Sequence, residues 1–226
     1  MTFIHPPVWP TENEMPQHPQ AIARRRLILT AAALLPATLS AIGSAAVRQL
    51  TPPQSRGPFY PDRLPLDQDN DLTRLSPTDQ SAAGEITELT GRVVDQHGSP
   101  LQDTLVEIWQ CDANGRYIHS GDRGGSPRDP GFQGYGRFRT GANGGYRFRT
   151  IKPVPYPGRA PHIHVAVTRP NGQRLVTQLY VEGAPDNARD LLRRSLSASQ
   201  RAAVTVPFEP DAGSETFSAH FDIVLA

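Results

Sequence analysis

Short apolar runs separated by turn-forming residues dominate the hydrophobic pattern of the chain after residue 85. These runs are rich in β-branched and aromatic residues, which is typical of β-strands. Glycine, asparagine, aspartate and proline lie between them, where tight turns are expected. The pattern predicts strands at residues 86–94, 105–110, 146–151, 162–168, 175–181 and 219–225. We therefore expect an all-β fold, an antiparallel β-sandwich with long loops and one short helix.

The short helix is predicted at residues 187–197, where leucines recur at helical spacing behind residues that favour an N-cap position. The apolar face would consist of Leu191, Leu192 and Leu196, and the N-cap would be Asp186 or Asn187. The glycine-rich stretch at 121–145 predicts a long loop, and long loops in compact domains are commonly functional.

Three parts of the chain differ in composition. Residues 1–46 have the pattern of an export signal, residues 47–85 form a proline-rich N-terminal arm, and residues 86–226 hold the β-sandwich domain. The arm includes a proline-rich run at 51–61 for which no regular secondary structure is expected.

The leader places three arginines, Arg24 to Arg26, before an uncharged stretch rich in alanine and leucine. Small residues at Ser44 to Ala46 suit cleavage near Ala46. The adjacent arginines are typical of a twin-arginine signal, which exports folded proteins, so we expect a periplasmic or extracellular protein. Two alternatives stay open: the leader can remain uncleaved as a membrane tether, and Met15 can be the true start.

Charge and cysteine content exclude several classes of function. The leader carries three of the 23 basic and two of the 22 acidic side chains, so 20 of each remain and the mature part has no net charge. This balance does not favour nucleic acid or an anionic membrane as a partner. Cys111 is the single cysteine, which rules out an intrachain disulfide and a thiolate metal cluster.

Two histidines, His162 and His164, stand one residue apart in a predicted strand, so both face the same side and one metal ion can contact both. Tyr156 precedes them by six residues, and Tyr117 follows a predicted turn. A phenolate is a hard anionic ligand that only a strongly Lewis-acidic ion keeps deprotonated at neutral pH. Fe(III) fits that requirement better than Zn(II), Cu(II) or Fe(II). Each residue also has an ordinary interpretation, as a rim tyrosine or a hydrogen-bonded histidine.

Seven ordered stretches resemble the intradiol ring-cleavage dioxygenases, in particular the catalytic subunits of the protocatechuate enzymes. They are residues 90–95, 104–110, 115–117, 146–153, 159–164, 177–180 and 221–225. Carried over position by position, the family's iron ligands fall on Tyr117, Tyr156, His162 and His164. The resemblance implies one non-haem Fe(III) per chain, and a reaction in which O2 cleaves a catechol-type ring between its two hydroxylated carbons. The product would be a cis,cis-muconate-type diacid.

The resemblance also implies roles for residues around the metal. Tyr156 would leave the metal and act as a base when substrate binds, and Arg159 would stabilise negative charge that develops on the ring. Gln178 matches a polar residue of the substrate pocket. Trp109 and Tyr60 are weaker candidates for lining the cavity, because aromatic residues in a sandwich more often belong to the core.

One departure from the family affects the substrate. Residues 157–161 alone separate Tyr156 from His162, whereas the protocatechuate enzymes have a longer segment there, so protocatechuate cannot be assumed as substrate. A homo-oligomer or a second subunit that completes the pocket stays open. So does a function of another class, a noncatalytic β-sandwich module that binds a partner and retains the site.

Overall fold

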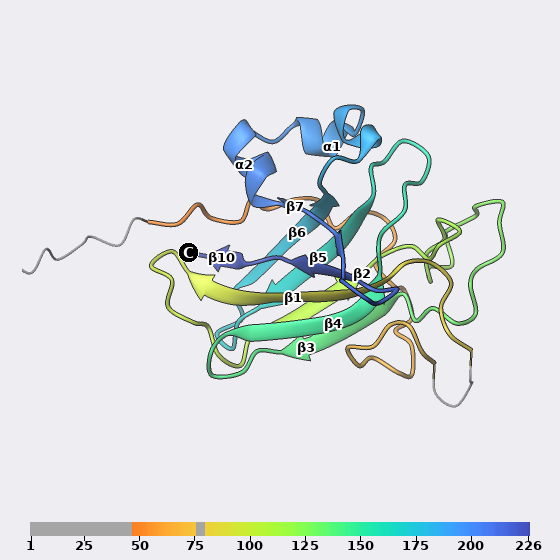
Figure 1. Cartoon of the computed structure of the whole chain (residues 1–226). Coiled ribbons are helices and arrows are strands. Elements are labelled where there is room, and N and C mark those ends of the chain that lie inside the picture. Colours follow the sequence, from red (N-terminus) through yellow and green to blue (C-terminus); the bar gives the residue numbers. More distant parts are fainter. Residues whose placement is uncertain (1–46, 76–79) are drawn as a thin grey trace, which may run out of the picture. The chain divides into compact units, whose positions relative to one another are not determined.

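Two five-stranded sheets pack face to face in the computed structural model, which describes residues 47–75 and 80–226 (Figure 1). The first sheet consists of β1 (Ile86–Asp95), β4 (Gly145–Ile151), β8 (Glu209–Pro210), β9 (Phe217–His220) and β10 (Ile223–Leu225). The second consists of β2 (Leu105–Trp109), β3 (Tyr135–Arg139), β5 (His162–Thr168), β6 (Arg174–Val181) and β7 (Thr205–Val206). The predicted all-β sandwich is confirmed. The export signal predicted at 1–46 lies outside the described residues.

The sheets are mixed rather than purely antiparallel, which corrects one part of the prediction. Strand β1 pairs with β4 in antiparallel fashion but with β9 and β10 in parallel, and β6 pairs with β7 in parallel. Long connections rather than tight hairpins lead to these parallel neighbours, and such connections permit parallel pairing.

Two strand predictions were wrong in detail. The strand expected at 219–225 is two strands, because the pairing with β1 is interrupted at Phe221 and Asp222: the Phe221 carbonyl accepts a hydrogen bond from the Tyr146 hydroxyl (2.5 Å), and Arg92 N donates to the Asp222 side chain. Gly91 permits this approach, since a Cβ there would lie 1.9 Å from the Phe221 carbonyl oxygen. Strand β3 lies inside the segment 121–145 that was predicted as a loop. The prediction missed it because its glycine and arginines hide the alternating pattern of a strand.

The single helix predicted at 187–197 is also wrong. The segment between β6 and β7 instead forms a 3₁₀ turn, η1, and two short helices, α1 and α2, with bounds Pro185–Ala188, Leu191–Arg194 and Ala198–Ala203. Asp190 caps α1 and Ser197 caps α2, and each cap starts a new helix where continuous periodicity had suggested one. No helix among the described residues is long and apolar enough to cross a membrane.

The two faces of the second sheet pack against different parts of the protein. Residues such as Ile108, Ile163 and Leu179 belong to the main core between the sheets. Their alternating neighbours Trp109, His164 and Gln178 therefore lie on the opposite face of the same sheet.

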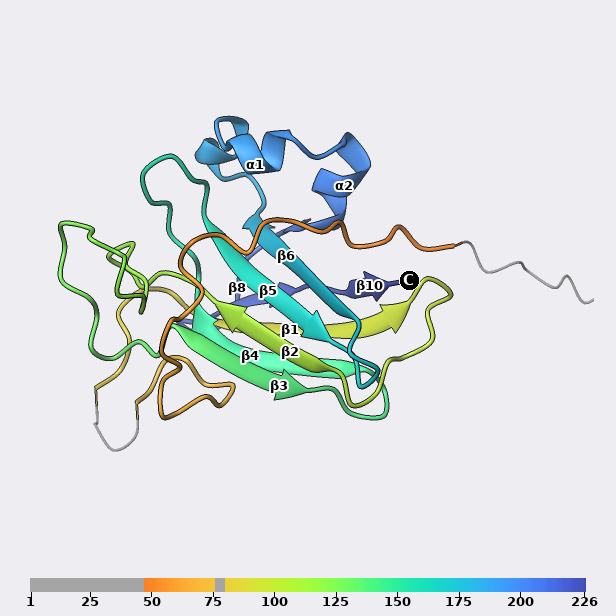
Figure 2. The same cartoon turned by 180° about the vertical axis from the view of Figure 1, so that it is seen from behind.

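The proline-rich arm covers this opposite face. Residues 51–57 contain no helix or strand, as expected, and run past β5 and β6 (Figure 2). The arm is fixed by backbone hydrogen bonds from Gln54 N to Val176 O (2.8 Å) and from Thr51 N to Val224 O (3.0 Å). The arm and the second sheet therefore enclose a layer of side chains distinct from the main core.

Candidate metal centre

His162 and His164 project from the same face of β5 and bring their Nε2 atoms within 3.2 Å of each other. The Tyr117 hydroxyl oxygen lies 3.5 Å from His162 Nε2. The Tyr156 ring completes the group, with its centroid 5.6 Å from that of Tyr117 and 5.5 Å from that of His162. The structure thus brings together all four side chains that the sequence predicted as metal ligands.

Cross-strand pairing fixes the histidine rings. His164 stands opposite Trp109 on β2 and opposite Gln178 on β6, and its ring stacks on the indole at 4.9 Å with an interplanar angle of 5°. His162 stands opposite Tyr180, with ring centroids 6.0 Å apart. Because β5 lies between two partner strands, neither histidine can turn without disturbing packed neighbours.

A tight turn directs Tyr117 toward the histidines. The Asp112 carboxylate accepts hydrogen bonds from the backbone N–H groups of Asn114 and Arg116, and Gly115 takes a positive φ of 75°. The Tyr117 N–H in turn donates to the Asp122 carboxylate (2.6 Å). The Asn-Gly signal in the sequence therefore serves to place a buried tyrosine, rather than a rim residue.

A second turn sets Tyr156 beside Arg159. Pro157 and Gly158 occupy its central positions, Gly158 has a φ of 81°, and Arg159 N donates to Tyr156 O (2.9 Å). Proline followed by a glycine of positive φ is the signature of a type II turn. This turn brings Arg159 Nη1 within 3.4 Å of the Tyr156 hydroxyl oxygen.

Both histidines are held neutral. His162 Nδ1 donates to the Ala160 carbonyl at 2.6 Å, so the proton sits on Nδ1 and the Nε2 lone pair points to the shared centre. Burial and then the Arg159 cation lower the pKa of His162 to about 4, and burial lowers that of His164 well below its ordinary value. Neutral imidazole is the form that binds metal ions.

The two phenols are shifted in the opposite direction. Burial raises the pKa of Tyr117 well above its ordinary value, and the neighbouring Tyr156 adds to the rise. Burial also raises the pKa of Tyr156, although the Arg159 cation opposes part of that effect. In the metal-free protein both phenols are therefore protonated at neutral pH, and only a strong cation against their oxygens would ionise them.

The donor set fits a trivalent metal ion. Two nitrogens that each lie ~2.1 Å from one ion can stand 3.2 Å apart, as the two Nε2 atoms do. Across residues 47–75 and 80–226 no group of three or more histidine, cysteine, aspartate or glutamate side chains is arranged to hold a metal. A metal at this centre would therefore depend on the two tyrosines, whose hard oxygens suit Fe(III).

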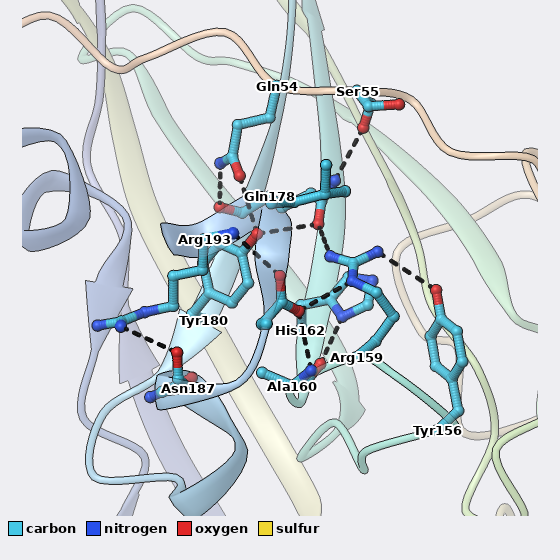
Figure 3. Close-up of polar contacts among 12 residues, drawn as sticks. Gln54, Ser55, Tyr156, Arg159, Ala160, His162, Gln178, Tyr180, Asn187 and Arg193 are labelled. Atoms are coloured by element: carbon cyan, nitrogen blue, oxygen red, sulfur yellow. Dashed lines mark hydrogen bonds and ion pairs between the residues drawn. The ribbon is translucent and has the colours of Figure 1, made fainter. Parts of the chain in front are cut away.

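Arg159 is anchored on three sides (Figure 3). Its Nε donates to Asp190 Oδ2 at 2.8 Å, its Nη2 donates to Gln178 Oε1, and its Nη1 faces Tyr156. The Gln178 amide is engaged at both ends, because its Nε2 donates to Ser55 O (2.8 Å). Gln178 therefore orients Arg159, and its predicted contact with substrate stays a prediction.

The other two predicted pocket residues, Trp109 and Tyr60, belong to one row of packed rings that begins at His164. Trp109 contacts His164 directly, and its Nε1 has no hydrogen-bond partner in the described part of the chain. Tyr60 packs edge-on against Trp109 at 4.9 Å, and its hydroxyl donates to the buried Glu107 (2.8 Å). The structure thus places Tyr60 farther along this stack, and Trp109 against the metal centre.

Sequence reasoning missed three residues near the centre. Phe59 of the arm stacks on Tyr117 at 5.1 Å, Gln54 accepts a hydrogen bond from Tyr180, and Asp190 binds Arg159. The arm residues carried no signal beyond proline richness. Asp190 had one, since an aspartate before Leu191 and Leu192 is a favourable N-cap.

A cavity of about 420 Å³ opens beside Tyr156 and Arg159. The turn that carries these two residues forms one wall, and the η1 segment with Asp186, Arg189 and Asp190 forms the other. Tyr156 is half-buried at this opening, whereas Tyr117 is buried behind it. Of the four predicted ligands, Tyr156 alone is among the residues that line this cavity.

The chain is similar to known dioxygenases over most of its length. The Dioxygenase family matches residues 55–226. Over 167 residues the chain is 41% identical to the protocatechuate 3,4-dioxygenase beta chain of Burkholderia cepacia. That alignment covers 70% of this chain and 71% of the relative. This chain belongs to the intradiol ring-cleavage dioxygenases. As a member of that family it is an oxidoreductase.

Other intradiol dioxygenases show how widely the likeness extends. A hydroxyquinol 1,2-dioxygenase of Corynebacterium glutamicum is 30% identical over 214 residues, covering 82% of this chain and 67% of the relative. The solved dioxygenase domain of a carbohydrate-binding fusion protein from Streptomyces sp. SirexAA-E is 30% identical, with a TM-score of 0.59. The alignment covers 78% of this chain and 98% of that domain. The residues that the family matches, 55–226, span both sheets and also Tyr117, Tyr156, His162 and His164.

Proposed function

We propose that this chain is a non-haem Fe(III) intradiol dioxygenase that opens a catechol-type ring with O2. The ring would break between its two hydroxylated carbons and give a cis,cis-muconate-type diacid. The observation that carries the proposal is the meeting of two neutral imidazole Nε2 atoms and two tyrosine rings, in a member of the intradiol family.

One Fe(III) per chain would be held by Tyr117, Tyr156, His162 and His164. When bound it would supply Lewis acidity that favours the deprotonated catechol and lets its ring carbon react with O2. The donor set supports this choice, because two phenolates and two imidazoles leave a modest positive charge that favours dianionic catechol.

Tyr156 is suited to receive a proton from an incoming catechol hydroxyl. It is half-buried at the cavity, and burial raises the pKa of its phenol, so its oxygen would be basic when no metal ion is bound to it. Tyr117 lies deeper, beside His162, and is suited to stay in place. A positioned base of this kind typically contributes about 10²- to 10⁴-fold to a rate.

Arg159 places a fixed positive charge next to Tyr156 at the edge of the cavity. A cation that is already oriented before reaction stabilises negative charge without reorganisation, and loss of one such group costs about 10²- to 10³-fold in kcat. Gln178 and Asp190 hold that cation in place. We assign Arg159 to the charge that develops on the opening ring.

The substrate is a catechol, with the ring substituents left to experiment. The named relatives act on protocatechuate, hydroxyquinol, catechol and chlorocatechol. The short turn between Tyr156 and His162 lines the cavity of about 420 Å³, so it would help to select the ring substituents. A homo-oligomer or a second subunit stays compatible with this proposal.

The test is an anaerobic titration of iron-loaded protein with catechol, protocatechuate, hydroxyquinol and methoxylated catechols, followed by O2 and analysis of the product. We expect the visible spectrum to shift with at least one catechol, and the product to be a diacid that carries both atoms of ¹⁸O2. Cleavage outside the two hydroxylated carbons would contradict the proposal. Protein that stays colourless and free of iron after iron supplementation would favour a noncatalytic binding module instead.

We also propose that the protein is exported, on the strength of the arginine-led, alanine-rich leader at 1–46. Replacing Arg24, Arg25 and Arg26 with lysine should leave the protein in the cytoplasm if the twin-arginine route is used. Cell fractionation and the mass of the exported chain would separate a cleaved leader from a membrane tether.

A further inference from the structure

The Asp190 carboxylate is completely buried at the start of helix α1, in one wall of the cavity. It accepts hydrogen bonds from Arg159 Nε (2.8 Å), Ala160 N (2.9 Å) and Arg193 N (2.9 Å). Burial by itself raises the pKa of a carboxyl, but the Arg193 and Ala160 N–H groups and the Arg159 cation outweigh it and lower the pKa of Asp190. The group is therefore a buried anion with defined partners.

Two routes lead from this carboxylate to the proposed ligands. The first runs through Arg159, whose guanidinium links Asp190 to Tyr156. The second runs through the Ala160 peptide, whose N–H donates to Asp190 and whose carbonyl accepts from His162 Nδ1 (2.6 Å). One carboxylate thus touches the supports of both a tyrosine and a histidine (Figure 3 shows Arg159 and Ala160 beside Tyr156 and His162).

We propose that Asp190 is a positioning residue that holds the Arg159 guanidinium against Tyr156 and thereby sets the rate of ring opening. This inference rests on the proposed function. The guanidinium is a planar fork, so fixing Nε on Asp190 and Nη2 on Gln178 leaves Nη1 one direction, toward Tyr156. Without Asp190 the Arg159 guanidinium keeps only its hydrogen bond to Gln178 as a support and can rotate away from Tyr156.

A purely structural role has to be separated from this one, because Asp190 also caps α1. Asp190→Asn keeps the shape but removes the charge and replaces one acceptor with an N–H donor. Asp190→Ser retains a good N-cap while giving up the contact with Arg159. Ser197→Ala is the matched control, since it removes the cap of the neighbouring helix α2, whereas the hydrogen bonds of the Arg159 side chain go to Asp190, Tyr156 and Gln178.

We expect both Asp190 variants to lower kcat per bound iron by about 10- to 100-fold, as loss of an outer partner at a metal site commonly does, with a smaller change in KM. Ser197→Ala should lower the thermal unfolding temperature and leave kcat per iron unchanged. In an Arg159→Gln background, Asp190→Asn should cost less than about threefold, because the two residues act as a unit. An equal loss in both backgrounds, or a loss of stability alone, would overturn the proposal.

Two readouts do not depend on turnover. The visible spectrum of the iron-loaded Asp190→Ser protein should differ from that of the wild type, since the cation beside the Tyr156 oxygen is displaced, while Ser197→Ala should match the wild type. Crystals of metal-free Asp190→Ser protein should show Arg159 Nη1 moved away from Tyr156. An unmoved guanidinium overturns the inference even where the wild type proves inactive, whereas an inactive wild type with a displaced guanidinium counts against the proposed function alone.

Discussion

The rings of Tyr117 and Tyr156 meet edge to face, with centroids 5.6 Å apart and planes at 90°. They come from two separate turns and differ in exposure, since Tyr117 is 2% exposed and Tyr156 borders the cavity. The two proposed ligands are therefore unequal, one enclosed by protein and one at the edge of a cavity.

This inequality predicts different losses for the two phenylalanine variants. Tyr117→Phe should lower the iron content per chain, because it removes a ligand that nothing else in the enclosed site can replace. Tyr156→Phe should keep more iron but lower kcat by about 10²- to 10⁴-fold, as loss of a positioned base does. Metal analysis and steady-state kinetics measure both effects.

Tyr146→Phe is the control for these variants. Tyr146 is a buried tyrosine of β4 whose hydroxyl donates to the Phe221 carbonyl, away from the metal centre. Its loss should reduce stability and leave iron content unchanged. Equal iron loss in all three variants would mean that the Tyr117 effect is one of folding.

Gly57 of the arm lies against His164, and its replacement should disturb the metal centre. It has a φ of 69°, and an added Cβ would lie 3.1 Å from His164 Cε1. Gly57→Ala should therefore cost about 1–2 kcal/mol in the free energy of unfolding from backbone strain and weaken iron binding. Denaturant unfolding and iron titration measure the two effects.

The matched control is Gly125→Ala. Gly125 is exposed, and an added Cβ there meets nothing within 4 Å. This variant should behave like the wild type in both measurements. Iron binding that is unchanged in Gly57→Ala would show that the arm does not support His164.

Cys111 should be chemically inert in the folded protein. It is buried behind Tyr117, and burial followed by the nearby Asp112 raises the pKa of its thiol to about 12. At pH 8 the thiol is therefore almost wholly protonated, and the thiolate is the reactive form. Iodoacetamide at pH 8 should label the protein in denaturant but not in the native state, as mass spectrometry can follow. Rapid stoichiometric labelling of native protein would refute this.

The sequence predicted which four side chains meet, because local geometry decides most of their arrangement. A strand puts His162 and His164 on one face whatever the rest of the fold does. The Pro157–Gly158 pair forces the turn that joins Tyr156 to Arg159. What remained was the approach of Tyr117 to these residues, which the family resemblance supplied.

Long-range contacts were the part that could not be predicted. The hydrogen bond from Ala160 to Asp190 spans 30 positions, and no periodicity connects the two. Expecting the helix to start at Asp186 or Asn187 also hid the cap at Asp190, because a continuous leucine pattern outweighed a local signal. The parallel pairings of β1 were also missed, because strand order depends on long-range packing rather than on the pattern within one strand.

The central claim is that two tyrosine oxygens and two histidines hold one Fe(III). Its most direct test is the visible absorption spectrum of the iron-loaded protein, recorded with metal analysis for the wild type and for Tyr117→Phe and Tyr156→Phe. We predict one iron per chain and a red-brown charge-transfer band that bleaches on reduction and shifts or disappears in each variant. A wild type that binds one iron per chain without such a band, or variants with an unaltered band, would contradict the account.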